Sequence, residues 1–293
     1  MKKSFSESVI EWIIRIFAGL SIVITIAIVA ILITESIPFF REVSIFEFLG
    51  TKTWSPNSEP GNFGVLPLLI GTFMIVIISA IFALPLGLGA AVYMSEYATP
   101  KVRAWVKPIL EILAGIPSVV YGFFALKFIT PIIQMIFPGT SVFNAMSAAI
   151  AVGIMITPTV ASLSEDALKS VPTAIREASY ALGTTKFETI TKIVIPAGFS
   201  GIMSSFILAI SRAIGETMIV AVAAGATPVL TFNPLNSIQT MTGYIVNKVQ
   251  GEVVVGTIEY QTIYAVALLL FVITLFFNYF AKFIAKRYQN KYD

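Results

Sequence analysis

Six apolar runs, each long enough to cross a lipid bilayer, constrain this chain more than any other feature of its sequence. They cover residues 12–33, 68–94, 109–130, 146–163, 199–224 and 262–284. About 20 apolar residues in a helix span the hydrocarbon core, and a helix satisfies its own backbone hydrogen bonds there. Only 12% of the residues are charged, against about 25% in soluble domains. The sequence therefore predicts an all-α, polytopic membrane protein with six transmembrane helices.

Lys and Arg are distributed unevenly between the runs. If the N-terminus is cytoplasmic, 13 of the 19 fall on the inner side and three on the outer side, at Arg41, Lys52 and Lys248. Such a bias predicts orientation, because basic loops stay in the cytoplasm. We therefore expect both termini to be cytoplasmic. The predicted units are an N-terminal transmembrane helix (1–34), an outer loop (35–67) and a domain of five helices (68–293) containing a cytoplasmic hairpin at 165–198. A second outer loop is expected at 227–260.

Several classes of function are disfavoured by what the chain lacks. It has no Cys and no His, so disulfides and imidazole metal sites are excluded. No Gly-Lys dipeptide occurs, so there is no phosphate-binding loop of the Walker A kind. We predict no catalytic residue, no metal site, no cofactor in this chain and no nucleic-acid partner. The first run is too long for a signal-peptide core and lacks a cleavage site, so we expect an uncleaved span.

The most distinctive polar segment, residues 173–196, reads as two short amphipathic helices. The first begins after Pro172 and stops at Gly183. Thr185 and Glu188 have the spacing of a capping box that opens the second helix, and Pro196 is expected to end it. Each helix has one apolar or small face, formed by Ile175, Ala178, Ser179 and Leu182 and by Phe187, Ile190 and Val194. A pair too polar to span should lie at the membrane surface, where a partner can reach it.

The hairpin resembles the EAA loop of ABC importer permeases. Glu177-Ala178-Ser179, then Gly183, then Ile193 and Pro196 follow that family's pattern at the family's spacing. The chain departs from it at Ser179 and Ile195, and we expect neither change to matter. The resemblance implies that this segment is a coupling helix pair that docks into an ATPase subunit. The alternative is an amphipathic hairpin that lies on lipid headgroups.

A charged constellation lies in the fifth run. Ser205, Ala209, Arg212 and Glu216 fall on one face of a continuous helix. Each charge costs about 2.5–3.5 kcal/mol at the centre of a bilayer, so this face should point into a bundle or a water-filled path. One interpretation is a closed Arg212–Glu216 pair that only fixes packing. The other is that Arg212 meets an oxyanion crossing the membrane, with Glu216 competing for the same guanidinium.

Weaker signals surround prolines and aromatic residues. Thr157 and Thr159 flank Pro158 and either satisfy backbone groups that it frees or line the path. Pro117 and the Pro85-Gly87-Gly89 cluster are expected to kink or break their spans. The first outer loop suits an interfacial belt or contact with an external partner, through Phe39, Phe40, Phe46, Phe48, Trp54 and Phe63.

Other stretches carry a narrower resemblance. Residues 48–54, 63–72, 85–98, 113–126 and 211–218 are similar to phosphate-specific ABC importer permeases of the PstC type. The resemblance implies the type I importer permease fold in a bacterial or archaeal plasma membrane. It also implies a second, related permease chain, two ATPase subunits that bind ATP and Mg, and an external phosphate-binding protein. In that family the intramembrane Arg and acidic residue, here Arg212 and Glu216, are implicated in phosphate passage.

The sequence leaves two rival functions open. The substrate of the importer could be another oxyanion, such as sulfate or molybdate, because an arginine serves any of them. From a different class, the chain could be a self-contained anion channel or an ion-coupled transporter. The hairpin disfavours the second option, since neither kind of protein needs an ATPase docking segment.

Overall fold

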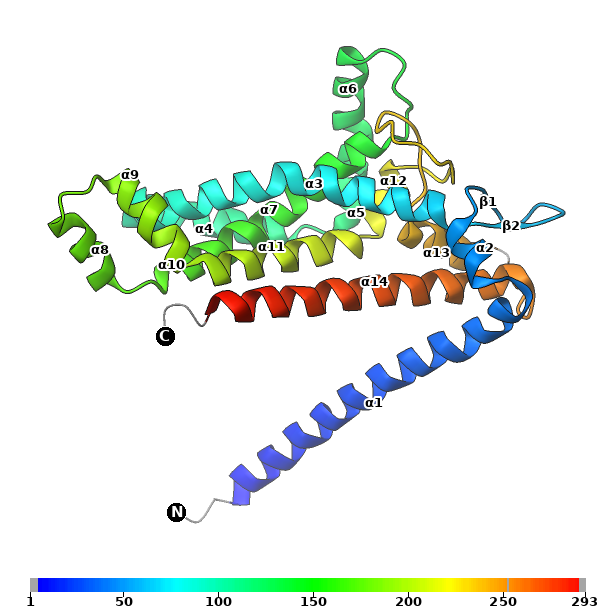
Figure 1. Ribbon diagram of the computed structural model, residues 1–293, viewed down its shortest axis with the longest axis horizontal. Coiled ribbons are helices and arrows are strands. Elements are labelled where there is room, and N and C mark those ends of the chain that lie inside the picture. Colours follow the sequence, from blue (N-terminus) through cyan, green and yellow to red (C-terminus); the bar gives the residue numbers. More distant parts are fainter. Residues whose placement is uncertain (1–4, 252, 290–293) are drawn as a thin grey trace.

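The computed structural model describes residues 5–251 and 253–289 of the chain. Four long helices lie side by side: α3 (Leu66–Val92), α7 (Ala145–Lys169), α11 (Phe199–Ile214) and α14 (Ile258–Gln289) (Figure 1). The N-terminal helix α1 (Phe5–Glu42) meets this bundle at one end and splays away from it. Lys2, Lys3 and Lys291, counted above as inner-side charges, lie outside the described residues.

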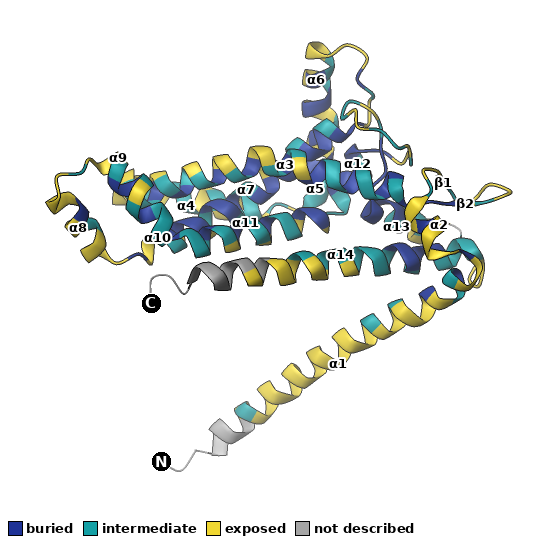
Figure 2. Cartoon of the chain, viewed as in Figure 1, coloured by how far each residue is buried: buried dark blue, intermediate teal, exposed yellow. Residues whose placement is uncertain are grey.

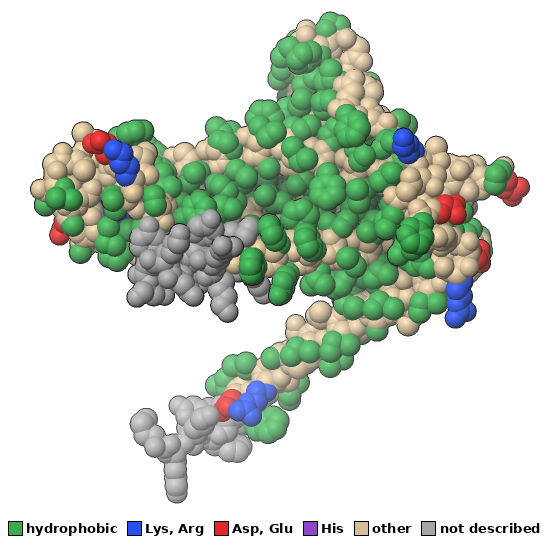
Figure 3. Space-filling view, in the orientation of Figure 1, with side chains coloured by type: hydrophobic (Ala, Val, Ile, Leu, Met, Phe, Trp, Pro, Cys, Tyr) green, Lys and Arg blue, Asp and Glu red, His purple; other side chains and the backbone are tan. Residues whose placement is uncertain are grey.

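The outside of the bundle is apolar, as a bilayer requires. Figure 3 shows hydrophobic side chains over its middle, with acidic and basic side chains towards its ends. Five helices in the described residues are long and apolar enough to span a membrane. A sixth is reached if one bent pair, Lys186–Ala197 with Phe199–Ile214, counts as a single span. The all-α membrane fold is therefore confirmed, and the sidedness of the termini stays a prediction.

The third predicted run is wrong in its bounds. Helix α4 (Pro100–Gly115) stops two residues before Pro117, and α5 (Ser118–Phe124) starts after it. The break arises because proline disfavours a helical conformation in the residue before it. The apolar stretch of spanning length is Ser118–Ile136. It comprises α5, the π-helical turn η2 (Ala125–Ile129) and α6 (Thr130–Ile136).

The fifth predicted run is not one helix either. The pair of helices around Gly198 is bent by 70°. Helix α11 then ends at Ile214, and a separate short helix, α12 (Met218–Ala223), follows after Gly215. Glycine has no Cβ, so it is often found where helices stop.

Both segments predicted to be outer loops contain more regular structure than expected. The first contains α2 (Ile45–Gly50) and an antiparallel pair of two-residue strands, β1 (Trp54–Ser55) and β2 (Asn62–Phe63). The second contains α13 (Met241–Gln250). Most of the aromatic residues expected at a belt or a partner are instead buried among themselves and against Tyr244. They form an aromatic cluster of edge-to-face contacts, which consists of Phe39, Phe40, Phe48, Trp54, Phe63 and Tyr244.

Helices α3 and α7 form the main core of the bundle, where Figure 2 shows the buried residues gathered. Helix α3 passes through Pro85 and continues into a π-helical turn, η1 (Tyr93–Tyr97), so the span is not broken there. Gly87 lets the two helices approach closely. A Cβ at this position would lie 2.6 Å from Cβ and Cγ1 of Val160.

Replacing Gly87 with alanine is expected to destabilise the protein by about 1–3 kcal/mol, because the stiff Val160 side chain cannot move away. Thermal unfolding of the purified protein in detergent measures the effect. Gly89→Ala is the matched control, since a Cβ there meets nothing within 4 Å. Both variants gain the same helix propensity. Equal unfolding temperatures for the two would show that Gly87 is not needed for close packing.

Candidate functional site

The polar hairpin folds as its local signals predict, with one exception. Helix α8 (Thr173–Ala181) is followed by Gly183 at φ +82°, a conformation that favours glycine. Helix α9 (Lys186–Thr189) then continues through the π-helical turn η3 (Ile190–Val194) into α10 (Ile195–Ala197). Pro196 therefore does not end the second helix as predicted. Ile195 and Pro196 lie in its last turn, and the chain bends at Gly198.

The predicted capping box is present. The Glu188 amide donates to Thr185 Oγ1 at 3.3 Å, and the Thr185 amide donates to Glu188 Oε2 at 3.1 Å. The Thr185 backbone, its hydroxyl and then Lys192 hold the pKa of the Glu188 carboxyl below its ordinary value. Because its pKa is lowered, the ionised Glu188 carboxylate stabilises the start of α9 at neutral pH. This stabilisation is lost only as the pH falls through the pKa of the folded state.

The predicted coupling residues occupy different environments. Glu177 and Ala178 are exposed, next to the large apolar side chains of Leu182 (85% exposed) and Phe187 (69%). Ile193 and Pro196 are half-buried in the second helix. Figure 1 shows the hairpin protruding from one end of the bundle. Exposed apolar side chains at the tip of a polar element are typical of a protein-binding surface.

The Ser179 side chain is buried, and its hydroxyl, which the alanine of the family pattern lacks, forms hydrogen bonds. Its hydroxyl lies 2.7 Å from Thr184 Oγ1 and 2.9 Å from Thr189 Oγ1, and those two hydroxyls are 2.9 Å apart. The three hydroxyls join α8 to the turn and to α9. The expectation that serine here is equivalent to alanine was wrong for this reason.

Ser179→Ala is expected to loosen the turn by about 1 kcal/mol, the usual net contribution of a hydrogen bond. The loss stays small because Thr184 and Thr189 keep their own contact. Faster hydrogen exchange of the backbone amides at residues 183–190 would report it. Ser204→Ala serves as the control, because that exposed hydroxyl bonds only within its own helix. Unchanged exchange in the Ser179 variant would contradict the proposed link.

Arg176 joins the hairpin to the membrane helices. Its guanidinium donates from Nη1 to Val171 O at 2.5 Å and from Nη2 to Leu168 O at 2.7 Å, at the end of α7. Nη2 also donates to Glu96 Oε1 at 3.0 Å, in the turn that follows α3. The two side chains are only 15% and 7% exposed. Sequence reasoning counted Arg176 only as an inner-side charge, since no local pattern relates it to a carboxylate 80 residues away.

The charged residues of the fifth run do not form the predicted pair. Arg212 lies in the last turn of α11, is exposed in the single chain and donates from Nη1 to Thr159 Oγ1 of α7 at 3.3 Å. Glu216 lies beyond the end of that helix. Its Oε1 accepts from the amides of Met218 and Ile219 at 3.1 Å each, so it caps α12. The single helical face assumed above does not exist, because α11 ends between the two residues.

Ser205 and Thr157 lie apart from Arg212. Ser205 is 1% exposed, and its hydroxyl lies 2.7 Å from Ser164 Oγ, between α7 and α11. Thr157 donates to Gly153 O within α7 at 2.7 Å. The sequence predicted four further path residues besides Arg212: Ser205, Glu216, Thr157 and Thr159. Of these, only Thr159 forms a hydrogen bond with Arg212 in the structure.

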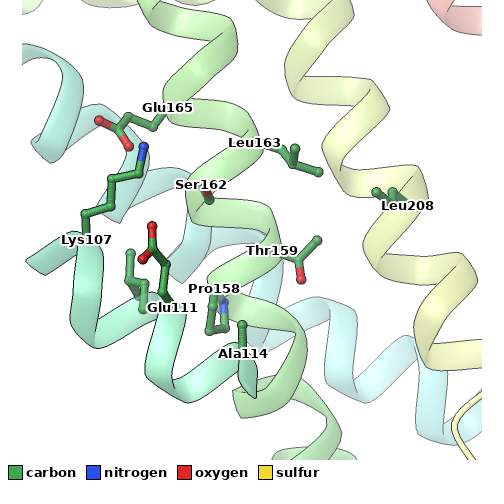
Figure 4. A pocket seen from close by; sticks show the side chains of 10 residues that line it. Lys107, Glu111, Ala114, Pro158, Thr159, Ser162, Leu163, Glu165 and Leu208 are labelled. Atoms are coloured by element: carbon green, nitrogen blue, oxygen red, sulfur yellow. The ribbon is translucent and has the colours of Figure 1, made fainter. Parts of the chain in front are cut away.

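A cavity of about 340 Å³ opens beside Thr159, between α4, α7 and α11 (Figure 4). Glu165 lies at its edge, fully buried, with Arg103 Nε at 2.7 Å and Lys169 Nζ at 2.5 Å from Oε1. The lining residues are Lys107, Leu110, Glu111, Ala114, Pro158, Thr159, Ser162, Leu163, Glu165 and Leu208. Of these residues, the sequence predicted only Thr159 to line a substrate path.

Comparison with known proteins identifies the family. Residues 83–290 match the family described as binding-protein-dependent transport system inner membrane component. The probable ABC transporter permease protein YqgH of Bacillus subtilis (strain 168) is 36% identical over 245 residues, which cover 84% of this chain and 79% of that protein. The phosphate transport system permease protein PstC of Mesorhizobium japonicum is 31% identical over 261 residues, covering 83% and 79%.

The fold agrees with solved importers. A chain of the bacterial alginate ABC transporter, solved in complex with an alginate pentasaccharide-bound periplasmic protein, superposes with a TM-score of 0.67 and covers 99% of both chains. Its identity of 15% makes this a likeness of fold alone. The chain belongs to the binding-protein-dependent transport system inner membrane component family and is a multi-pass plasma-membrane permease subunit of an ABC importer.

Proposed function

We propose that this permease imports inorganic phosphate. The observation that carries the proposal is Arg212, whose guanidinium lies within a membrane span and, among the residues that the structure describes, hydrogen-bonds a single hydroxyl, that of Thr159. A planar cation with free donors suits a tetrahedral oxyanion. The relative named as a phosphate transport system permease, 31% identical over most of both chains, supports phosphate in particular.

A second permease chain would complete the path. Arg212 is exposed in the single chain, beside Leu208 (53% exposed). A charge within a span does not face lipid, because exposure to hydrocarbon costs several kcal/mol. This face therefore suits contact with a related chain, with the path between the two.

Energy would come from two ATPase subunits that bind the exposed tip of the hairpin. ATP closes the ATPase dimer, the hairpin moves, and Arg176 passes that movement to the cytoplasmic ends of α3 and α7. The path then opens outwards, and an external binding protein releases phosphate into it. Hydrolysis resets the path to face the cytoplasm. This chain performs no bond chemistry.

Purification of the complex from its native membrane, followed by reconstitution in liposomes, tests the proposal. We expect an ATPase and a second permease to co-purify, and we expect uptake of radiolabelled phosphate that requires ATP and the binding protein. Sulfate and molybdate serve as competing substrates. ATP-dependent uptake of sulfate or molybdate by a complex that does not take up phosphate would overturn the assignment of phosphate as the substrate. Anion flux through this chain alone, without ATP, would indicate a channel instead.

A further inference from the structure

The exposed side of α4 changes in character along the helix. Lys101, Trp105 and Ile109 follow at intervals of four residues, so they form one ridge. All three are exposed, Trp105 by 77%, and the exposed Ile112 continues the apolar surface. A cation, then an aromatic ring, then aliphatic side chains is the order in which a helix meets the headgroups, the interface and the hydrocarbon of one leaflet. This side of α4 therefore suits contact with lipid.

The position of α4 in the bundle agrees with that order. Arg103 contacts Glu165, one turn before α7 ends at Lys169. Ala114 lines the cavity together with Pro158, about two turns further into α7. Helix α4 thus starts at the hairpin end of the bundle and runs towards its middle. Its 16 residues reach about 24 Å, less than the roughly 30 Å of a hydrocarbon core, so α4 passes the interface and lies in the leaflet on the hairpin side.

A furrow of about 370 Å³ runs along α4 beside this ridge. Its lining residues are Pro100, Arg103, Ala104, Lys107, Pro108 and Glu111. The three short side chains follow at intervals of four residues and form its floor, and the three charged ones form the neighbouring row and so its far edge. All six belong to α4, so the furrow opens away from the other helices. Its mouth is the end at Pro100, where α4 begins.

Positive charge is in excess at the mouth of the furrow. Arg103 pairs with Glu165. Lys101 and Lys107 form no ion pair and no side-chain hydrogen bond with any residue that the structure describes. Glu111, the other acid along the furrow, lies at its deeper end, one turn beyond Lys107. Long lysine side chains can place their ammonium groups at the headgroup level, and a cation beside hydrocarbon needs a counter-ion. The mouth therefore suits an anion.

We propose that the furrow of α4 binds an anionic phospholipid of the leaflet on the hairpin side. The lipid phosphate lies between Lys101 and Lys107, the Trp105 ring packs beside the glycerol backbone, and an acyl chain follows the floor over Pro108 to Ile112. Basic sites at the ends of membrane helices are typical binding places for anionic headgroups. Inorganic phosphate carries a similar charge, but only a lipid also covers the apolar side chains. The site would be occupied whichever substrate the importer carries.

Quenching of tryptophan fluorescence by brominated lipids identifies what covers α4. The complete complex is reconstituted in vesicles of phosphatidylcholine and phosphatidylglycerol, in which one or the other lipid carries bromine on its acyl chains. The difference between wild type and Trp105→Phe isolates the emission of Trp105, because all other tryptophans contribute equally to both. We expect Trp105 to associate with phosphatidylglycerol about tenfold more strongly than with phosphatidylcholine, since two lysines attract the anionic headgroup.

Charge variants test the role of the two lysines in the same measurement. The double variant Lys101→Gln/Lys107→Gln should lose the preference, so that both lipids quench Trp105 alike. Lys101→Arg/Lys107→Arg keeps both charges and should keep the preference. Lys52→Gln, which removes an exposed charge far from α4, is the matched control and should behave as wild type. Addition of inorganic phosphate should leave the preference unchanged.

Three results would overturn the lipid site. Equal quenching of wild-type Trp105 by the two lipids, or a preference that survives in the double glutamine variant, would show that the lysines select no headgroup. Absence of quenching by either lipid would show that a protein chain covers this side of α4. Loss of the preference on adding inorganic phosphate would assign the cations to the free anion. None of these measurements involves transport, so they stand or fall separately from the proposed import of phosphate.

Discussion

Arg212→Gln is expected to abolish phosphate uptake while the complex stays assembled. At an effective dielectric constant of about 20, a unit charge 4 Å from an anion contributes roughly 4 kcal/mol. Loss of that charge within the span should slow transport by about two to three orders of magnitude. Assembly should survive, because the side chain is exposed and makes one hydrogen bond within the described part of the chain, at 3.3 Å, which glutamine can replace.

Uptake by proteoliposomes and co-purification of the subunits measure the two parts of this prediction. Arg212→Lys keeps the charge without the planar fork, so an intermediate rate is expected. Arg41→Gln, at an exposed arginine near the end of α1, should have no effect. Full transport by Arg212→Gln would mean that the guanidinium only helps α11 to pack against α7.

Arg176→Gln is expected to uncouple ATP hydrolysis from transport. The change removes three hydrogen bonds that tie α8 to the ends of α3 and α7, and it leaves the nearly buried Glu96 carboxylate without its cation. Breaking one side of a buried pair costs on the order of 3 kcal/mol. The hairpin can then move with the ATPase without moving the spans. ATP hydrolysis should continue, and phosphate taken up per ATP should fall by about tenfold or more.

The ratio of uptake to hydrolysis in one preparation checks this prediction. The double variant Glu96→Gln/Arg176→Gln should recover part of the lost stability, because no unpaired carboxylate remains. Lys192→Gln is the control in the same hairpin. Its pair with Glu188 is exposed, with side chains 70% and 41% accessible, and contributes little. An unchanged ratio in Arg176→Gln would show that the movement travels by another route.

Local sequence patterns predicted the parts of the fold that depend on neighbouring residues. Helix α7 starts at Ala145, one residue from the predicted run, because its apolar periodicity and capping residues lie within a few positions. The capping box of α9 and the glycine turn after α8 are local in the same sense. The membrane class followed from composition, since few chains this apolar remain soluble.

Breaks in the helices were predicted less well. The fifth run was interpreted as one helix because hydropathy continues through Gly215, although glycine followed by Glu216 is a stop signal and then a cap. That error placed Glu216 on the face of Arg212. Pro117 was recognised as a possible break, yet the span was still centred on it.

Contacts between distant segments could not be predicted at all. The Arg176–Glu96 pair and the buried Glu165 with its two cations join residues whose proximity depends on how α3, α4 and α7 pack. The aromatic residues of the first outer loop were assigned to the surface for the same reason. Their partner, Tyr244, is supplied by α13, far along the chain.

The aromatic cluster at the start of α3 has a mechanical consequence. Its rings pack the start of α3, the loop before it and α13 together, so we expect this end of α3 to act as a fulcrum if the helix tilts. The 27 residues of that helix form a rod about 40 Å long. Each degree of tilt about the fulcrum then shifts the Glu96 end by roughly 0.7 Å. In the proposed import cycle, a small movement of the hairpin would therefore shift the Glu96 end of α3, while the end held by the aromatic cluster would stay in place.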